Sequence, residues 1–235
     1  MPVMTRAEML ITAIVQTLVP MNSTATGKTV IKNAMNTDLS SPQAPLPVVG
    51  LLLAGGAGTR MDGKDKGMLH WRGRPMAAWV AEALRAATGS PLISANRSIE
   101  EYGRLGEVVT DAPEFSGRGP LAGLLAGLQE ACGRGYGAAL VCPCDTPGVT
   151  PALLRLLLQA WRSAPERPVI ARCDGRNHPL HGVYPVAMAA ALERQLRNDN
   201  RRVMMFAHSQ QAQSLDCPGL SELFTNRNRP QDLKD

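Results

Sequence analysis

Short runs of consecutive apolar residues recur along the chain after residue 47. Runs of this length, without alternation of polar positions, are typical of strands that are buried on both faces, as in a parallel sheet. The first run stops at Gly55 and Gly56, and two later runs stop just before Asp111 and Asp145. The predicted strands cover residues 48–53, 92–95, 108–110, 138–142 and 169–171.

Between these runs, apolar residues recur every three or four positions, which is the spacing of one face of an α-helix. The first helical segment opens at Pro75, a favourable residue for a helix start. Strands that alternate with helices predict an α/β fold, a Rossmann-like three-layer sandwich with a mostly parallel sheet. In such sheets ligands bind beyond the carboxyl ends of the strands. The periodic positions are Met76, Trp79, Val80, Ala83, Leu84 and Ala87, then Leu121, Leu124, Leu125 and Leu128, then Leu153, Leu154, Leu157, Leu158 and Trp161.

The first 47 residues differ from the rest, because they contain no aromatic residue and a single glycine, Gly27. They end in a segment rich in serine and proline, which is typical of a linker. We expect residues 1–47 to be a flexible extension, or the product of a start codon placed too early, with Met21 and Met35 as later starts. A secretory signal and a P-loop-like pattern at residues 22–29 are weaker alternatives.

Composition narrows the classes of protein mainly by exclusion. The 235 residues include 44% hydrophobic and 19% charged residues, as in an ordinary globular protein. No run of 18 apolar residues exists, which argues against a membrane span. A net charge of +5 spread over 235 residues produces only a weak electrostatic field. Because the chain also has no run of basic residues and no aromatic platform for stacking bases, the charge does not indicate nucleic-acid binding. The five irregularly spaced cysteines indicate reduced thiols and a cytoplasmic protein.

The most informative segment is the glycine-rich, basic loop after the first predicted strand. Gly55, Gly56 and Gly58 let backbone N–H groups approach an anionic ligand closely. Arg60 and Lys66 bring positive charge to the same loop, and both side chains bind phosphate. A turn that simply requires glycine would not explain the two cations. We therefore predict a triphosphate site.

Two better-known phosphate loops do not fit this segment. A dinucleotide fingerprint would need a third glycine where Met61 stands. A P-loop would need a serine or threonine hydroxyl for magnesium where Asp65 stands. The loop is therefore predicted to bind a nucleotide in another type of fold.

Asp111 and Asp145 each follow a predicted strand, so both should lie at the edge of the sheet that carries the glycine-rich loop. A carboxylate beside a triphosphate is repulsive unless a divalent cation lies between them. Magnesium prefers one or two carboxylates together with phosphate oxygens. Asp145 is therefore the predicted metal ligand, with capping of the following helix as the alternative. Asp111 is expected to contact a ribose hydroxyl or a base edge, or to cap a turn.

Motifs along residues 48–235 resemble a known family. The pattern L-A-G-G-x-G-x-R-M at 53–61, with D-K-G at 65–67, is shared by nucleotidyltransferases with a glycosyltransferase-A-like Rossmann fold. More specific segments resemble the molybdenum cofactor guanylyltransferases. They are A-N-R at 95–97, G-P-L-A-G at 119–123, C-P-C-D-T-P at 142–147, R-R-V-M at 201–204 and F-T-N-R-N-R-P at 224–230.

The resemblance implies one nucleotidyltransferase domain over residues 48–235 and a reaction. GMP would pass from GTP to the phosphate of molybdenum-molybdopterin with Mg²⁺, which releases pyrophosphate and forms the molybdopterin guanine dinucleotide cofactor. Arg60, Lys66 and Asp145 would be catalytic, and Asp145 would also bind the metal. The nucleotide would contact Leu53, Ala54, Gly55, Gly56, Gly58, Lys66, Ser94, Asn96, Asp111 and Asp145.

For the second substrate, the resemblance points to Arg201, Arg202, Asn226 and Asn228 as residues that bind the pterin. The chain is expected to be a monomer, and molybdoenzyme-specific chaperones or apoenzymes are possible further partners. Cys142 and Cys144 are interpreted as small residues that pack at a strand end rather than as metal ligands.

The chain departs from the family pattern at two positions. Ser94 stands where the family usually has an asparagine that touches the nucleotide, and Asp62 stands where a glycine is common. Neither departure removes a charge that the reaction requires. Both bear on the detail of the nucleotide contacts.

Other functions remain open alternatives. A cytidylyltransferase of the same pathway, or another enzyme that joins a nucleoside triphosphate to a phosphate, would use the same chemistry with a different base or acceptor. The segments at 53–56 and 119–123 resemble those of the guanylyltransferases, and this resemblance favours guanine as the base. A non-catalytic cofactor carrier would not need Arg60, Lys66 and Asp145 together.

Overall fold

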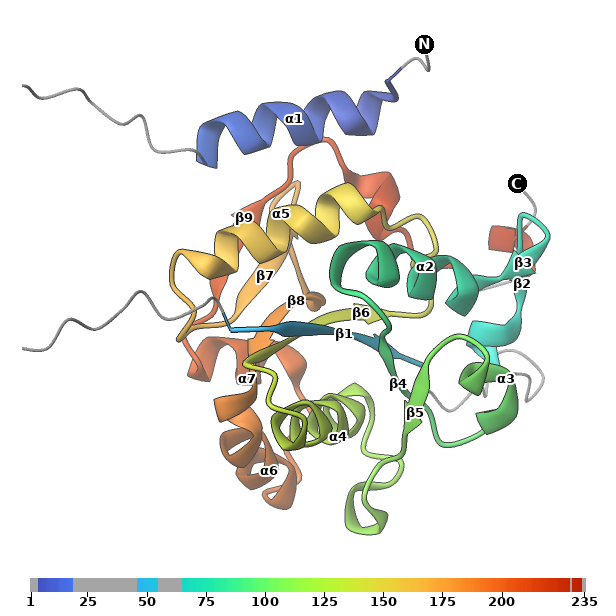
Figure 1. Ribbon diagram of the computed structural model, residues 1–235, viewed down its shortest axis with the longest axis vertical. Coiled ribbons are helices and arrows are strands. Elements are labelled where there is room, and N and C mark those ends of the chain that lie inside the picture. Colours follow the sequence, from blue (N-terminus) through green and yellow to red (C-terminus); the bar gives the residue numbers. More distant parts are fainter. Residues whose placement is uncertain (1–3, 19–45, 55–64, 229, 234–235) are drawn as a thin grey trace, which may run out of the picture.

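The computed structural model describes residues 4–18, 46–54, 65–228 and 230–233. Its centre is a seven-stranded sheet in the order β5-β4-β1-β6-β8-β7-β9 (Figure 1). The strands are β1 (Val48–Leu53), β4 (Leu92–Ser94), β5 (Glu107–Val109), β6 (Ala138–Pro143), β7 (Val169–Cys173), β8 (Arg176–Pro185) and β9 (Gln213–Asp216). A separate hairpin pairs β2 (His70–Trp71) with β3 (Arg74–Pro75).

The half of the sheet that carries the predicted site is parallel. β1 pairs in parallel with both β4 and β6, and β4 with β5. β8 then runs antiparallel to β6 and β7, and β9 is parallel to β7. The predicted α/β fold with a mostly parallel sheet is therefore confirmed, with one reversed strand that the sequence pattern did not indicate.

Helices cover both faces of the sheet and complete the three layers (Figure 1). α2 (Met76–Thr88) and α5 (Pro151–Arg162) lie on one face, and α4 (Pro120–Gly133), α6 (Ala189–Arg197) and α7 (Val203–Ser209) lie on the other. The short α3 (Ile99–Gly103) lies near β5. No helix in the described part of the chain is long and apolar enough to cross a membrane.

Alternate residues of β1 divide the core between the two helical layers. Leu52 belongs to the apolar cluster that includes α2 and α5, whereas Leu51 and Leu53 belong to the cluster with α4, α6 and α7. This two-sided burial follows from the alternation of side chains along a strand. It also explains why the run at 48–53 is continuously apolar.

The N-terminal segment, expected to be a flexible extension, contains the helix α1 (Arg6–Leu18), which packs against α5. Thr5 and Glu8 form a reciprocal capping box, because the backbone N–H of each donates to the side chain of the other, at 2.7 and 3.2 Å. Ile11 is buried in the core cluster. The low glycine content and absence of aromatics did not indicate this packing. The P-loop-like pattern at 22–29 lies outside the described residues.

Helix α4 lies so close to β1 that a side chain at Gly127 would collide with Leu51, whose Cδ2 lies 2.3 Å from the position of an added Cβ. We expect Gly127→Ala to lower the free energy of unfolding by about 1–3 kcal/mol through overpacking. Urea unfolding followed by circular dichroism would measure the change.

Gly133, the last residue of the same helix, provides a matched control because nothing lies within 4 Å of its added Cβ. Gly133→Ala should stabilise the protein by up to about 1 kcal/mol through helix propensity. Equal effects of the two substitutions would contradict the close packing of α4 on β1.

Candidate active site

The carboxyl ends of the parallel strands meet at one edge of the sheet and position most of the predicted site residues. Leu53 and Ser94 end β1 and β4 and face each other in register. The backbone N–H of Ala54 donates to the carbonyl of Ser94 at 2.8 Å, which ties the start of the glycine-rich loop to β4. Gly55, Gly56, Gly58, Arg60 and Asp62 lie outside the described residues, and their predicted roles remain predictions.

A cavity of about 370 Å³ opens at this edge, between the ends of β1, β4 and β5 and the start of α4. Four predicted nucleotide contacts line it together: Leu53, Ser94, Asn96 and Asp111. The sequence analysis did not assign the other lining residues to the site, although several fall in the family-like segments. They are Arg97, Ser116, Gly117, Gly119, Pro120 and Gly123.

The close approach of α4 to β4 explains two small residues in this cavity. A Cβ at Gly123 would lie 2.2 Å from Oγ of Ser94. Ser94 is almost fully buried, so a larger side chain there would meet the helix. Gly119 precedes the helix with φ +79°, a backbone conformation that favours glycine. The G-P-L-A-G segment therefore shapes the wall of the cavity.

Asn96 and Asp111 hold each other in place in the wall of the cavity. Nδ2 of Asn96 donates to Oδ2 of Asp111 at 2.8 Å, and the backbone N–H of Asp111 donates to Oδ1 of Asn96 at 2.9 Å. Burial raises the pKa of Asp111, and the Asn96 hydrogen bond opposes that shift. Oδ1 of Asp111 is buried without a hydrogen-bond partner among the described residues. This oxygen can therefore accept a hydrogen bond from a ligand.

A second group of predicted residues meets around Lys66. Its ammonium Nζ lies 2.5 Å from Oδ2 of Asp145 and also donates to Oδ1 of Asn228. The backbone N–H of Arg227 donates to the carbonyl of Asp145 at 2.8 Å. The C-terminal segment is thus attached to the turn after β6. It brings Asn228 close to Lys66 and Asp145, which precede it by 162 and 83 positions in the chain.

The pattern-based analysis missed Tyr102, which supports the D-K-G segment. Its hydroxyl donates to Oδ1 of Asp65 at 2.6 Å, and Asp65 in turn accepts from the backbone N–H of Gly67 at 3.2 Å. A Cβ at Gly67 would lie 2.3 Å from the Tyr102 hydroxyl, so only glycine fits. Arg97 Nε lies 3.7 Å from the other carboxylate oxygen of Asp65. These contacts fix the turn that presents Lys66.

Cys142 and Cys144 are both buried at the end of β6. Burial is the main cause that raises the pKa of Cys144 to about 12, and the nearby Asp145 carboxylate raises it further. Burial likewise raises the pKa of Cys142 well above its ordinary value. Both thiols are therefore protonated at neutral pH, in agreement with a packing role.

A second cavity, of about 580 Å³, lies beside Lys66 and contains Asn226 and Asn228 among its lining residues. His178 also lines this cavity and stacks on Phe224, with 4.4 Å between ring centroids. Behind them, the buried His181 shares a 2.9 Å hydrogen bond with the Thr146 hydroxyl. Burial lowers the pKa of His181 to about 3, so this ring is neutral.

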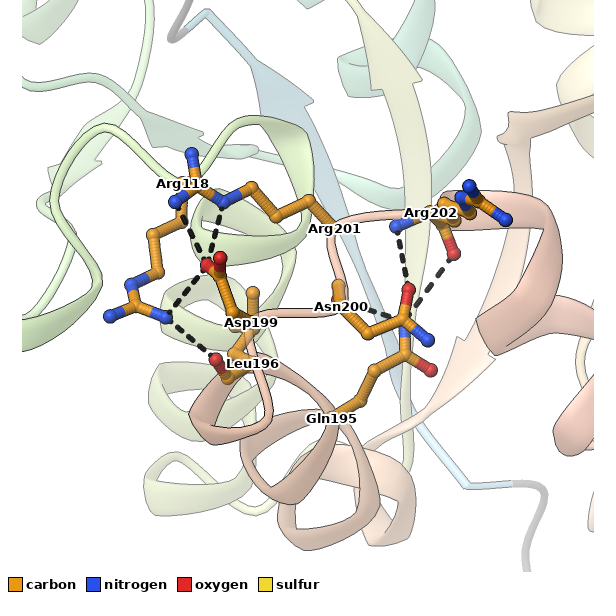
Figure 2. Close-up of polar contacts among 7 residues, drawn as sticks. All are labelled: Arg118, Gln195, Leu196, Asp199, Asn200, Arg201 and Arg202. Atoms are coloured by element: carbon orange, nitrogen blue, oxygen red, sulfur yellow. Dashed lines mark hydrogen bonds and ion pairs between the residues drawn. The ribbon is translucent and has the colours of Figure 1, made fainter.

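The structure does not group Arg201 and Arg202 with Asn226 and Asn228. Both arginines lie in the loop between α6 and α7, beside a different depression of the surface. Figure 2 shows that they point in different directions: Arg201 turns toward Asp199 and Arg118, whereas the Arg202 guanidinium points away from that pair. The four residues predicted to bind pterin thus belong to two separate places.

No group of three or more histidine, cysteine, aspartate or glutamate residues in the described ranges could hold a metal ion by itself. Asp145 does suit an ion held mainly by a nucleotide, because magnesium commonly takes one or two carboxylates together with phosphate oxygens. Its side chain is 18% exposed, and its Oδ2 already holds the Lys66 ammonium, which shows that a cation fits against this oxygen.

Comparisons with known proteins agree with this geometry. A family model described as the MobA-like NTP transferase domain matches residues 50–213. A molybdenum cofactor guanylyltransferase of Pseudomonas paraeruginosa is 35% identical over 191 residues, which cover 81% of this chain and 95% of that protein. One from Cereibacter sphaeroides is 40% identical over 185 residues, which cover 78% and 92%.

The fold is also similar to that of a solved structure. The crystal structure of molybdopterin-guanine dinucleotide biosynthesis protein A from Archaeoglobus fulgidus has a TM-score of 0.62 at 24% identity, and the match covers 79% of this chain and 94% of that one. The family match reaches from β1 to the first residue of β9, so it includes the whole site edge of the sheet. The chain is a nucleotidyltransferase. It belongs to the MobA-like NTP transferase domain family.

Loss of the Tyr102 hydroxyl should loosen the turn that presents Lys66. Tyr102→Phe removes one of the two donors to Oδ1 of Asp65 and leaves only the Gly67 backbone N–H, so we expect a loss of about 1–3 kcal/mol in the free energy of unfolding. The KM for the nucleotide should rise as well. Denaturant titration and steady-state kinetics would measure the two effects.

Tyr136 is the control, because its hydroxyl makes no hydrogen bond with any residue that the structure describes. Tyr136→Phe should change neither quantity. If Tyr102→Phe behaved in the same way, Tyr102 would have no part in supporting Asp65.

Proposed function

We propose that this protein transfers GMP from GTP to the phosphate of molybdenum-molybdopterin with Mg²⁺, releases pyrophosphate and forms the molybdopterin guanine dinucleotide cofactor. The observation that carries the proposal is the pairing of Lys66 with Asp145, which follows β6 at the same carboxyl edge of the sheet as the cavity. The relatives named molybdenum cofactor guanylyltransferase support the choice of GTP and of the pterin acceptor.

Lys66 and Asp145 supply the charge that the transfer requires. Asp145 would hold the Mg²⁺, and the ion would neutralise phosphate charge as pyrophosphate leaves. Lys66 would then exchange the carboxylate for phosphate oxygens, to which an ammonium binds as a point charge. Arg60, with the backbone of Gly55, Gly56 and Gly58, is proposed to complete the cradle.

The nucleoside would occupy the cavity lined by Leu53, Ser94, Asn96 and Asp111, and the backbone of Ala54, which follows Leu53, is proposed to contact it as well. Oδ1 of Asp111 is the acceptor that the described part of the cavity leaves unpaired. A guanine edge or a ribose hydroxyl can donate to it. Pairing with a ligand donor would offset the cost of burying this carboxylate.

Acceptor binding is proposed for Asn226 and Asn228, which line the cavity beside Lys66, and for Arg201 and Arg202 on the α6–α7 loop. An oxygen of the acceptor phosphate forms a bond to the α-phosphorus as the bond from that phosphorus to the bridging oxygen of pyrophosphate breaks. A phosphate is already ionised at pH 7, so no general base is needed. Positioning and charge neutralisation are the main contributions of the protein.

Two features support a cytoplasmic site of action and a catalytic rather than carrier role. All five cysteines are free, as expected in a reducing compartment. A protein that only carries the finished cofactor would not require the lysine–aspartate pair. A cytidylyltransferase remains the alternative that the choice of base must decide.

Pyrophosphate release with molybdenum-loaded molybdopterin and Mg²⁺ tests the proposal directly. We expect release with GTP and not with CTP, and we expect Asp145→Asn to lower kcat at least about 100-fold through the loss of the charge that holds the ion. Glu107→Gln, which removes one exposed carboxylate away from the site, is the control for net charge. Release with CTP would reassign the base, and absence of release with both would favour a carrier.

Asp111 allows a second test that separates binding from stability. Since burial raises the pKa of Asp111, its stabilising contribution is greatest at acid pH and falls as pH rises through the shifted pKa. Asp111→Asn should therefore leave the ligand-free protein at least as stable as the wild type at pH 7. The same substitution should weaken the binding of GTP about tenfold. Thermal unfolding and binding of a fluorescent GTP analogue would measure these effects, and unchanged GTP affinity would exclude Asp111 from the nucleotide site.

A further inference from the structure

Asp199 lies between two guanidinium groups from distant parts of the chain (Figure 2). Its Oδ1 accepts three N–H donors, from Nη1 of Arg118 at 3.3 Å and from Nε and Nη2 of Arg201 at 3.0 and 2.8 Å. These two arginines hold the pKa of Asp199 below its ordinary value, with Arg201 the larger cause. One oxygen with donors from two guanidinium groups is the arrangement that arginine pairs offer to a phosphoryl oxygen.

The backbone at Asp199 is one that favours glycine over aspartate. Asn198 ends α6, and Asp199 follows it with φ +53°. The N–H groups of Asp199 and Asn200 donate back to the carbonyls of Leu196 and Gln195 at 2.9 and 3.1 Å. This is a Schellman motif, in which the left-handed position is usually glycine, sometimes asparagine. The geometry of the helix end therefore does not by itself explain why this position is an aspartate.

Arg118 belongs to the segment that lines the cavity proposed for the nucleotide. Arg118 stands between Gly117 and Gly119, which both line that cavity. Nη1 of Arg118 also donates to the carbonyl of Leu196 at 2.8 Å, so the end of α6 fixes this guanidinium close to the start of α4. Nε and Nη2 of Arg118 make no hydrogen bond with any described residue and can serve a ligand.

We propose that Arg118 and Arg201 form a binding site for the phosphate group of the acceptor, and that the Asp199 carboxylate occupies this site until the substrate displaces it. The inference rests on the proposed function for the identity of the acceptor. Asp199 is 68% exposed, so an incoming anion can reach the pair. The exposed ion pairs are weak enough to be exchanged.

The chemistry of the transfer favours the acceptor phosphate as the occupant. The nucleotide phosphates would have Lys66 and a cation held by Asp145, whereas an anionic acceptor that attacks them would need cations of its own. Two guanidinium groups would offset the repulsion between the two substrates. Arg118 and Arg201 therefore act as binding residues for the acceptor, and Asp199 acts as an internal competitor.

Kinetics of four variants tests the proposal, with GTP and molybdenum-loaded molybdopterin varied separately. Arg118→Gln should raise the acceptor KM about tenfold. Asp199→Asn should lower it about threefold, because asparagine keeps the left-handed backbone and removes the competing charge. The KM for GTP should stay within about twofold in both.

Arg134 and Glu107 are the matched controls, because they form a similar arginine–carboxylate pair at the far end of α4. Arg134→Gln and Glu107→Gln change the net charge in the same way and should leave the acceptor KM unchanged. The proposal would be overturned if Asp199→Asn raised the acceptor KM. It would also be overturned if Arg118→Gln changed the KM for GTP instead of the KM for the acceptor.

Calorimetric titration with inorganic phosphate tests the site without turnover. Asp199→Asn should bind phosphate about threefold more tightly than the wild type, and adding Arg118→Gln to that variant should abolish the gain. If this order holds while molybdopterin is not a substrate, the phosphate site stands and the proposed acceptor is wrong. If turnover is normal but neither phosphate affinity nor acceptor KM responds to Arg118→Gln, the proposed function stands and the phosphate site does not.

Discussion

The half-buried ion pair between Lys66 and Asp145 is the contact on which the rest of the site depends. It joins three segments that no single secondary-structure element connects: the turn after the glycine-rich loop, the turn after β6, and the C-terminal segment through Asn228. Each partner is anchored on its other side, Lys66 by the turn that Asp65 and Tyr102 hold, and Asp145 by the Arg227 backbone. These anchors fix two opposite charges in place at the carboxyl edge of the sheet.

Close packing of backbone elements sets the shape of the cavity at the carboxyl edge of the sheet. Helix α4 approaches β4 so closely that Gly123 and Ser94 must both be small. The departure at Ser94 from the family pattern is therefore compatible with the position of the helix. Asn96 and Asp111, which also line the cavity, hold each other in place by two hydrogen bonds.

The sequence predicts those features of the fold that rest on local pattern. Buried parallel strands, the helices α2, α4 and α5 and the placement of Asp111 and Asp145 all follow from apolar runs, periodicity and the geometry of parallel sheets. The polar first half of β8 and the short β9 carry no such pattern. Helix α1 was missed because the composition of the whole segment concealed one apolar face and a capping box.

Contacts between distant residues could not be derived from spacing. Arg201 and Arg202 are neighbours in sequence and are predicted to share one role, yet their guanidinium groups point in different directions. The partner of Asp199 across the fold, Arg118, lies 81 residues away in a segment noted only for its glycines. Which charges meet depends on helix ends and loop turns, and these are specified by tertiary packing.

The attachment of the C-terminal segment to Asp145 also has a consequence for synthesis of the protein. Every strand of the sheet is complete by residue 216, but Asn228 and the Arg227 backbone reach the site only afterwards. Domains begin to fold while the chain is still being made. A nascent chain can therefore form its sheet and the cavity at the carboxyl edge before the lysine–aspartate pair receives its last contacts, so the surroundings of this pair are completed only after the sheet.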